Sequence, residues 1–230
     1  MFNMNQKRLN ALSGKSWIKL SKSTWITRKL LAWSGRVPLQ LDTTFLVNNK
    51  TDRKKNMTYR PLDESRVKLI ELLTLPGQCV FDPCLQHGDS LAAALSVNRQ
   101  FVGISDNEQQ SNGIVDSLDV NLKNKPYMLL NRKRTVNPLT LIKNNSVDLL
   151  LTEIPVFDFN SALISYQKSL SDLKVIVESY RQKLKKKAYI ALIVSDQRYK
   201  GQYYCRHSDI IHLLENADFK LQGLDRKSVV

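Results

Sequence analysis

The chain is 230 residues long and 42% hydrophobic, which suits one domain with a sizeable core. No apolar run approaches a membrane span, and the first residues, MFNMNQKRLNALSGKSW, lack the apolar segment of a secretory signal. The formal net charge of +14 favours a polyanionic partner, and nucleic acid before a membrane surface, because no basic amphipathic helix with a clear apolar face stands out.

Residues 1–61 form a basic extension that we expect to pack on the domain that follows. They hold 13 lysines and arginines against two acids, a net charge of +11. Over 15–33 cations alternate with three tryptophans, which either anchor the segment on the main domain or stack on nucleic-acid bases. A short strand is expected at 43–47. The cations that we predict to bind nucleic acid are Lys15, Lys19, Lys22, Arg28, Arg53, Lys54 and Lys55.

Residues 62–230 have the pattern of an α/β domain. The segment 62–75 has helical spacing, and Pro76-Gly77 ends it. Strands and helices then alternate, and continuous apolar runs such as YIALIV (189–194) indicate buried parallel strands. This alternation predicts a doubly wound, mostly parallel sheet with helices on both faces. The expected strands are 78–82, 100–105, 126–131, 147–152, 188–195 and 219–224, and the expected later helices are 89–97, 107–118, 161–186 and 207–216.

The stretch VFDPCLQHGDSLAAALSVNRQFVGISDN (80–107) has the outline of a nucleotide-cofactor site. A strand runs into Asp-Pro, a short loop with one glycine, an alanine-rich helix and a second strand that ends near an acid. Such a turn lets backbone amides and a helix N-terminus meet the polar part of a nucleotide, and the acid commonly binds ribose hydroxyls. In doubly wound sheets this is also the edge where ligands bind.

This stretch resembles the S-adenosylmethionine motif of the DNA methyltransferases that act on amino groups and make N6-methyladenine or N4-methylcytosine. Other segments resemble the family in the same order, over nearly the whole chain: SWIKLSKSTW (16–25), MTYRPLDESRVKLIELLTLPG (57–77), NNSVDLLLTEIPVF (144–157) and residues 179–224. The likeness leaves almost no length for a separate target-recognition domain. It implies a Rossmann-like methyltransferase fold with S-adenosylmethionine as cofactor. Asp82, Pro83 and Gly88 match the family in the cofactor half, with Asp106 one place after the family's acid, and Glu153, Pro155 and Phe157 are the candidate residues of the catalytic loop.

The cofactor half departs from the family in three places. Gln86 and His87 replace small loop residues, and side chains there crowd the place where backbone approaches the cofactor. The family's acid falls on Ser105, and Asp106 can serve only if the strand has already ended, because neighbouring strand residues point to opposite faces. The basic run 132–134 replaces an acid near the adenine. These changes predict that cofactor binding is weak or lost.

The catalytic loop, TEIPVF (152–157), also departs from the family. The family presents a polar oxygen and a proline carbonyl to the target amine and stacks an aromatic ring on the flipped base. If Glu153 takes the polar place, Val156 takes the aromatic place. If Phe157 is the aromatic residue, Ile154 takes the polar place. Either register loses one requirement.

The other polar residues predict structural roles and no metal site. Cys79, Cys84 and Cys205 are an odd number in no metal-ligand spacing, so we expect free thiols in an intracellular protein of the cytoplasm, nucleoid or nucleus. His207 is expected to cap or begin a helix, too far from His212 for shared metal binding. The Asp-x-Arg pair at 196–198 suits a salt bridge, a turn or a ligand contact. The basic run 181–187 is expected to be a solvated helix end.

Three functions remain open on these grounds. The preferred hypothesis is a catalytically degenerate subunit that binds DNA, or RNA as the other candidate polymer, beside an active methyltransferase. The first alternative is an active S-adenosylmethionine-dependent DNA methyltransferase in which Glu153 holds the amine and Phe157 stacks on the base. The second is a protein-interaction scaffold whose basic surface meets an acidic partner.

Overall fold

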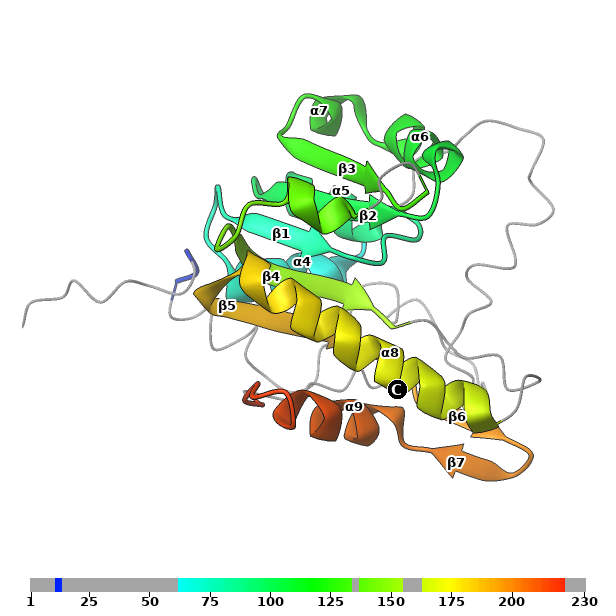
Figure 1. Ribbon diagram of the computed structural model, residues 1–230. Helices are drawn as coiled ribbons and strands as arrows, with labels where there is room; N and C mark the ends of the chain where they lie inside the picture. Colours follow the sequence, from blue (N-terminus) through cyan, green and yellow to red (C-terminus); the bar gives the residue numbers. More distant parts are fainter. Residues whose placement is uncertain (1–10, 14–61, 134–136, 155–162, 222–230) are drawn as a thin grey trace, which may run out of the picture.

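The computed structural model describes residues 11–13, 62–133, 137–154 and 163–221, except for some side chains of α8 (Leu163–Tyr180) and that of Gln197 (Figure 1). The tryptophan-rich extension and the strand expected at 43–47 lie outside these ranges. The proposed division of the chain at residue 61 therefore stays a prediction. Among the described residues no helix is long and apolar enough to cross a membrane.

Five strands form a parallel sheet in the order β3-β2-β1-β4-β5 (Figure 1). The order reverses between β1 and β4, because the chain adds β2 and β3 on one side of β1 and then crosses to the other side. This confirms the predicted parallel α/β sheet, whose strand order is consistent with a Rossmann-like fold. The strands are β1 Cys79–Asp82, β2 Gln100–Ser105, β3 Tyr127–Asn131, β4 Val147–Glu153 and β5 Leu184–Ile193.

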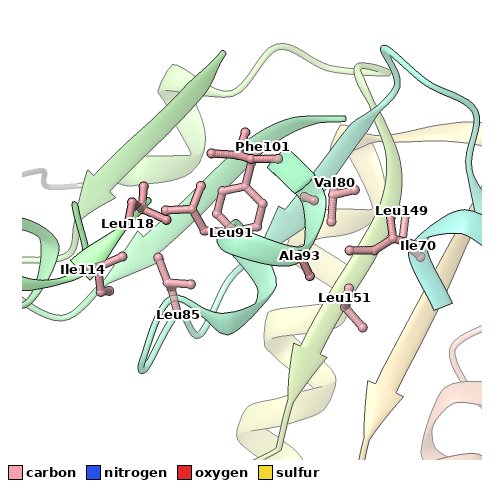
Figure 2. Packing of buried hydrophobic residues seen from close by; sticks show 12 residues of the cluster. Ile70, Val80, Leu85, Leu91, Ala93, Phe101, Ile114, Leu118, Leu149 and Leu151 are labelled. Atoms are coloured by element: carbon pink, nitrogen blue, oxygen red, sulfur yellow. The ribbon is translucent and has the colours of Figure 1, made fainter. Parts of the chain in front are cut away.

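Helices pack on both faces of the sheet. They are α4 Glu64–Leu73, α5 Asp89–Ser96, α6 Glu108–Ser117, α7 Val120–Lys123, α8 Leu163–Tyr180 and α9 Arg206–Glu215. Successive strand residues point to opposite faces. In β1, Val80 packs with Ile70 of α4 and Leu91 of α5 (Figure 2), whereas Phe81 meets the Tyr180 ring of α8 edge-on, with centroids 5.1 Å apart. Two separate apolar clusters therefore hold the helices on the sheet.

Strand β5 begins earlier than the sequence predicts. The helix expected to reach residue 186 ends at Tyr180, and 181–187 is not a helix end because β5 starts at Leu184. The exposure expected for its cations is present at Arg181, Lys186 and Lys187. Leu184 is buried, and Lys185 donates to the Asp148 carboxylate at 2.8 Å. The Asp148 side chain is only 8% exposed, and a buried carboxylate needs a cation. Its pairing with Lys185 and the burial of Leu184 therefore favour a strand here over the helix end that the run of basic residues suggested.

The last part of the described chain holds a hairpin that the sequence did not predict. Strands β6 (Gln197–Tyr199) and β7 (Gln202–Tyr204) pair antiparallel, and α9 follows them close to its expected bounds. A strand was expected over 219–224. Its described part, 219–221, is not a strand, and the remainder lies outside the described ranges. Phe219 instead packs into the cluster beneath α8.

Candidate functional site

The candidate site lies at the carboxyl ends of β1 and β4, where the strand order reverses. A shallow pocket there has a cavity volume of about 20 Å³ and is lined by α4, the loop after β1, the start of α5 and the end of β4. Small-molecule sites usually offer roughly 300–1,000 Å³. The pocket therefore occupies the expected position but is small for a nucleotide cofactor.

Asp82 ends β1 and ties it to β4. Its Oδ1 accepts hydrogen bonds from Thr152 Oγ1 at 2.8 Å and from the Cys84 backbone amide at 3.0 Å. The side chain is buried, and this burial raises the pKa of Asp82 against the opposing effect of its hydrogen bonds. These contacts of Asp82 are made within the protein and hold β1 to β4.

Gly88 makes the turn into α5 possible. Its φ of +82° lies in the left-handed region that favours glycine. A Cβ atom at this position would stand 2.6 Å from Ile114 Cγ2 of α6, so glycine is also needed for the close packing of two helices. The turn that the sequence predicts here is present.

The loop residues Gln86 and His87 are exposed at the rim of the pocket. Both residues line the pocket, in the loop where the sequence predicts that side chains crowd the approach of a cofactor. The Gln86 carbonyl accepts a hydrogen bond from Gln110 Nε2 at 2.8 Å, and Gln110 Oε1 accepts from the Asp106 amide at 2.9 Å. Gln110 of α6 thus links the loop after β1 to the end of β2.

Asp106 stands just beyond the end of β2, because the strand finishes at Ser105. The condition for Asp106 to face a ligand is therefore met, and its side chain is 70% exposed. Ser105, in the place of the family's acid, is buried instead, with its Oγ 2.5 Å from Ser111 Oγ. The strand end therefore still presents a carboxylate, one residue later.

Arg132 spans the same corner from the end of β3. One of its terminal nitrogens donates to the Pro83 carbonyl at 2.7 Å, and the other lies 3.7 Å from Asp106 Oδ1. The guanidinium therefore reaches across the end of β2 and forms an ion pair with the exposed Asp106. Burial opposes its charge, but contacts with Cys84 and acids leave the pKa of Arg132 raised. In the basic run that the sequence indicated after β3, Arg132 connects the end of β3 to the loop after β1.

Arg66 of α4 is a site residue that the sequence reading missed. It pairs with Asp63, the N-cap residue of α4, and with Glu153 Oε2 at 2.5 Å, 87 residues along the chain. The Arg66 side chain is 10% exposed. Burial opposes its ionisation, but the two carboxylates outweigh burial and raise the pKa of Arg66. The available signal was its position four residues before Ile70, on the inward face of the predicted helix.

Glu153 is the last residue of β4, and Ile154 after it is buried with its amide bonded to the Ile193 carbonyl at 2.9 Å. Glu153 therefore points to the site while Ile154 points to the core. The remaining predicted site residues lie outside the described ranges: Pro155, Phe157, Lys15, Lys19, Lys22, Arg28, Arg53, Lys54 and Lys55.

The site thus combines a glycine turn, a buried structural aspartate and two arginines that each engage a carboxylate. Comparison of the chain with models of protein families gives no match, and comparison with curated proteins gives none either.

Proposed function

We propose that this chain is a catalytically degenerate relative of the amino-group DNA methyltransferases, which binds nucleic acid as a subunit beside an active methyltransferase. The observation that carries the proposal is the ion pair between Arg66 and Glu153. In the family the corresponding oxygen accepts hydrogen bonds from the target amine. Here one carboxylate oxygen is already held by a nearly buried cation, so Glu153 is a poor acceptor.

The charged groups at the carboxyl ends of β1 and β2, where the cofactor would bind, support the same conclusion. S-adenosylmethionine carries a positive sulfonium centre, and two guanidinium groups border this edge. Arg132 also forms an ion pair with Asp106, the carboxylate that could bind ribose hydroxyls. A small pocket with engaged acids predicts that S-adenosylmethionine binds weakly or not at all.

The charge of the chain supports a nucleic-acid partner. Exposed lysines occur in the described domain, including three successive residues of β5, Lys185, Lys186 and Lys187. Lys185 forms an ion pair with Asp148, whereas Lys186 and Lys187 are exposed on the strand. When such lysines contact nucleic-acid phosphates, the counterions condensed on the phosphates are released, and this release favours binding.

Calorimetric titration with S-adenosylmethionine tests the cofactor part of the proposal. We expect no binding at micromolar concentration by the natural chain. Arg132→Gln should improve any weak affinity, because it removes the cation and frees Asp106, whereas the matched control Lys133→Gln should not. Micromolar binding together with methyl transfer that Glu153→Ala abolishes would show instead that the chain is an active methyltransferase.

That active enzyme is the second candidate, and one observation favours it. The turn at Gly88 and the exposed Asp106 preserve two parts of the cofactor motif.

Binding of labelled DNA and RNA at about 50 mM salt tests the proposed nucleic-acid partner. Affinity for either polymer supports the proposed subunit. Absence of affinity, alone and with an added methyltransferase partner, would favour the protein-interaction scaffold.

A further inference from the structure

The β6–β7 hairpin brings together two residues that sequence spacing kept apart. Gln197 pairs with Tyr204 across the hairpin, so Asp196 and Cys205, one place further out, lie side by side. The turn at Lys200 and Gly201 has positive φ at both residues, +46° and +81°, the conformation that suits a two-residue hairpin loop. The hairpin therefore defines the relative position of a carboxylate and a thiol.

His207 completes this group from the first turn of α9. Its Nδ1 lies 2.8 Å from both carboxylate oxygens of Asp196. The Cys205 sulfur lies 3.7 Å from Nδ1 and 3.6 Å from Nε2. One ligand-type atom from each of the three side chains lies within 4.8 Å of the others. The three residues come from one short segment, 196–207, so no distant element has to move to bring them together.

The surroundings hold the group in place. The Tyr203 hydroxyl donates to Asp196 Oδ2 at 2.6 Å, and the His207 amide donates to Asp196 Oδ1 at 3.2 Å. The carboxylate and imidazole are partly shielded, with side-chain exposures of 20% and 23%. Hydrogen bonds of this kind orient metal ligands and fix their geometry.

The spacing agrees with a tetrahedral ion. Zinc–sulfur bonds of about 2.3 Å and zinc–nitrogen bonds of about 2.0–2.1 Å place sulfur and nitrogen roughly 3.5 Å apart. The observed separations are 3.6 and 3.7 Å. The carboxylate–imidazole distance of 2.8 Å is that of a hydrogen bond, so an ion would replace the bridging proton and separate these groups slightly. Rotation of the imidazole about its Cβ–Cγ bond decides which nitrogen faces the ion.

We propose that Asp196, Cys205 and His207 bind a transition-metal ion, with Zn²⁺ the preferred occupant. A thiolate and an imidazole select zinc over magnesium or calcium, which prefer oxygen ligands. Binding displaces the thiol proton, since the thiolate is the ligand form. Three protein ligands leave a fourth tetrahedral position for water or for a group from a partner. The site is distinct from the pocket at β1 and β4, and the proposal does not depend on the methyltransferase hypothesis.

Titration of the metal-free, full-length protein with Co²⁺ tests the site, because a cobalt–thiolate bond gives a charge-transfer absorption band. We expect one ion per chain and displacement of cobalt by Zn²⁺. Cys205→Ser should abolish the band and weaken zinc binding by at least about 10- to 100-fold. Asp196→Asn should weaken zinc binding but keep the band, since the thiolate remains.

Two matched variants serve as controls. Cys84→Ser removes another partly buried thiol, and His212→Ala removes the exposed histidine of α9, so both should leave the band and the zinc affinity unchanged. Circular dichroism confirms that each variant is folded. Absence of the band in the natural chain would overturn the proposal. An equal loss in Cys84→Ser would also overturn it, because cobalt would then be bound by thiols unselectively.

Discussion

At the scale of single residues, Gly88 controls the turn between β1 and α5. Replacement by alanine forces a side chain into the left-handed region and brings its Cβ to 2.6 Å from Ile114 Cγ2. We expect Gly88→Ala to lower the free energy of unfolding by about 1–3 kcal/mol, from backbone strain and overpacking. Urea unfolding followed by circular dichroism measures this loss.

Gly113, in the middle of α6, is the matched control. A Cβ atom there would meet nothing within 4 Å, and the backbone is helical. Gly113→Ala should raise the free energy of unfolding by about 0.5–1 kcal/mol, because alanine is the better helix former. Equal destabilisation by both substitutions would show that the turn at Gly88 has no special requirement for glycine.

Asp82 makes stability depend on pH. Burial raises its pKa in the folded protein above the value in the unfolded chain, so its protonated form favours folding and this contribution is lost as pH rises through the folded-state pKa. Asp82→Asn retains an oxygen that can accept from Thr152 and Cys84. We therefore expect Asp82→Asn to unfold at an equal or higher temperature near neutral pH, with its relative advantage shrinking on acidification.

Thermal unfolding of both proteins between about pH 4 and pH 8 measures this difference. A loss of stability in Asp82→Asn that is the same at every pH would mean that hydrogen-bond geometry, rather than ionisation, governs the site.

At the scale of elements, Arg66 joins α4 to the end of β4. Removing it leaves two carboxylates without their cation, and we expect Arg66→Met to destabilise the fold by about 2–4 kcal/mol. Glu153→Gln should cost about 1 kcal/mol or less, because the Glu153 side chain is 48% exposed and water compensates it. Urea unfolding of both single variants and the double variant gives the coupling energy. Additive effects would show that this ion pair contributes nothing.

The start of β5 depends on a second ion pair between elements. Asp148 accepts from the Cys79 amide at 3.0 Å and from Lys185 at 2.8 Å. Lys185→Met removes the cation beside a nearly buried carboxylate and should destabilise the protein by about 1–3 kcal/mol. Lys186→Met is the control on the same strand, and its exposed side chain predicts a change within about 0.5 kcal/mol. Similar losses in the two variants, measured by thermal unfolding, would contradict the role of Asp148.

At the scale of the whole molecule, the net charge of +14 predicts strongly salt-dependent binding to nucleic acid. The logarithm of the affinity should fall linearly with the logarithm of salt concentration, by about 0.9 for each phosphate contact with duplex DNA. Neutralising Lys186 and Lys187 together should reduce this slope by about 1–2 if β5 meets phosphates. Fluorescence anisotropy over a salt series measures the slope, and an unchanged slope would place the interface elsewhere.

The sequence by itself determined the parallel sheet and the place of the glycine turn at the carboxyl end of its first strand. Local periodicity carries this information, since apolar runs such as 147–152 must be buried on both faces and helices must cover them. The residues whose role is set by the local turn, Asp82 and Gly88, could be chosen for the same reason. Their backbone requirements are visible in the motif itself.

Only the tertiary structure decided which charged groups meet. The contact of Arg66 with Glu153 spans 87 residues, and Arg132 reaches Pro83 across the end of β2. The start of β5 depends on a buried carboxylate in the neighbouring strand, which a local charge pattern cannot reveal. The cluster of Asp196, Cys205 and His207 likewise follows from the register of a hairpin. These partners are far apart in sequence or irregularly spaced, so periodicity does not predict them; they meet only after strand order and register are set.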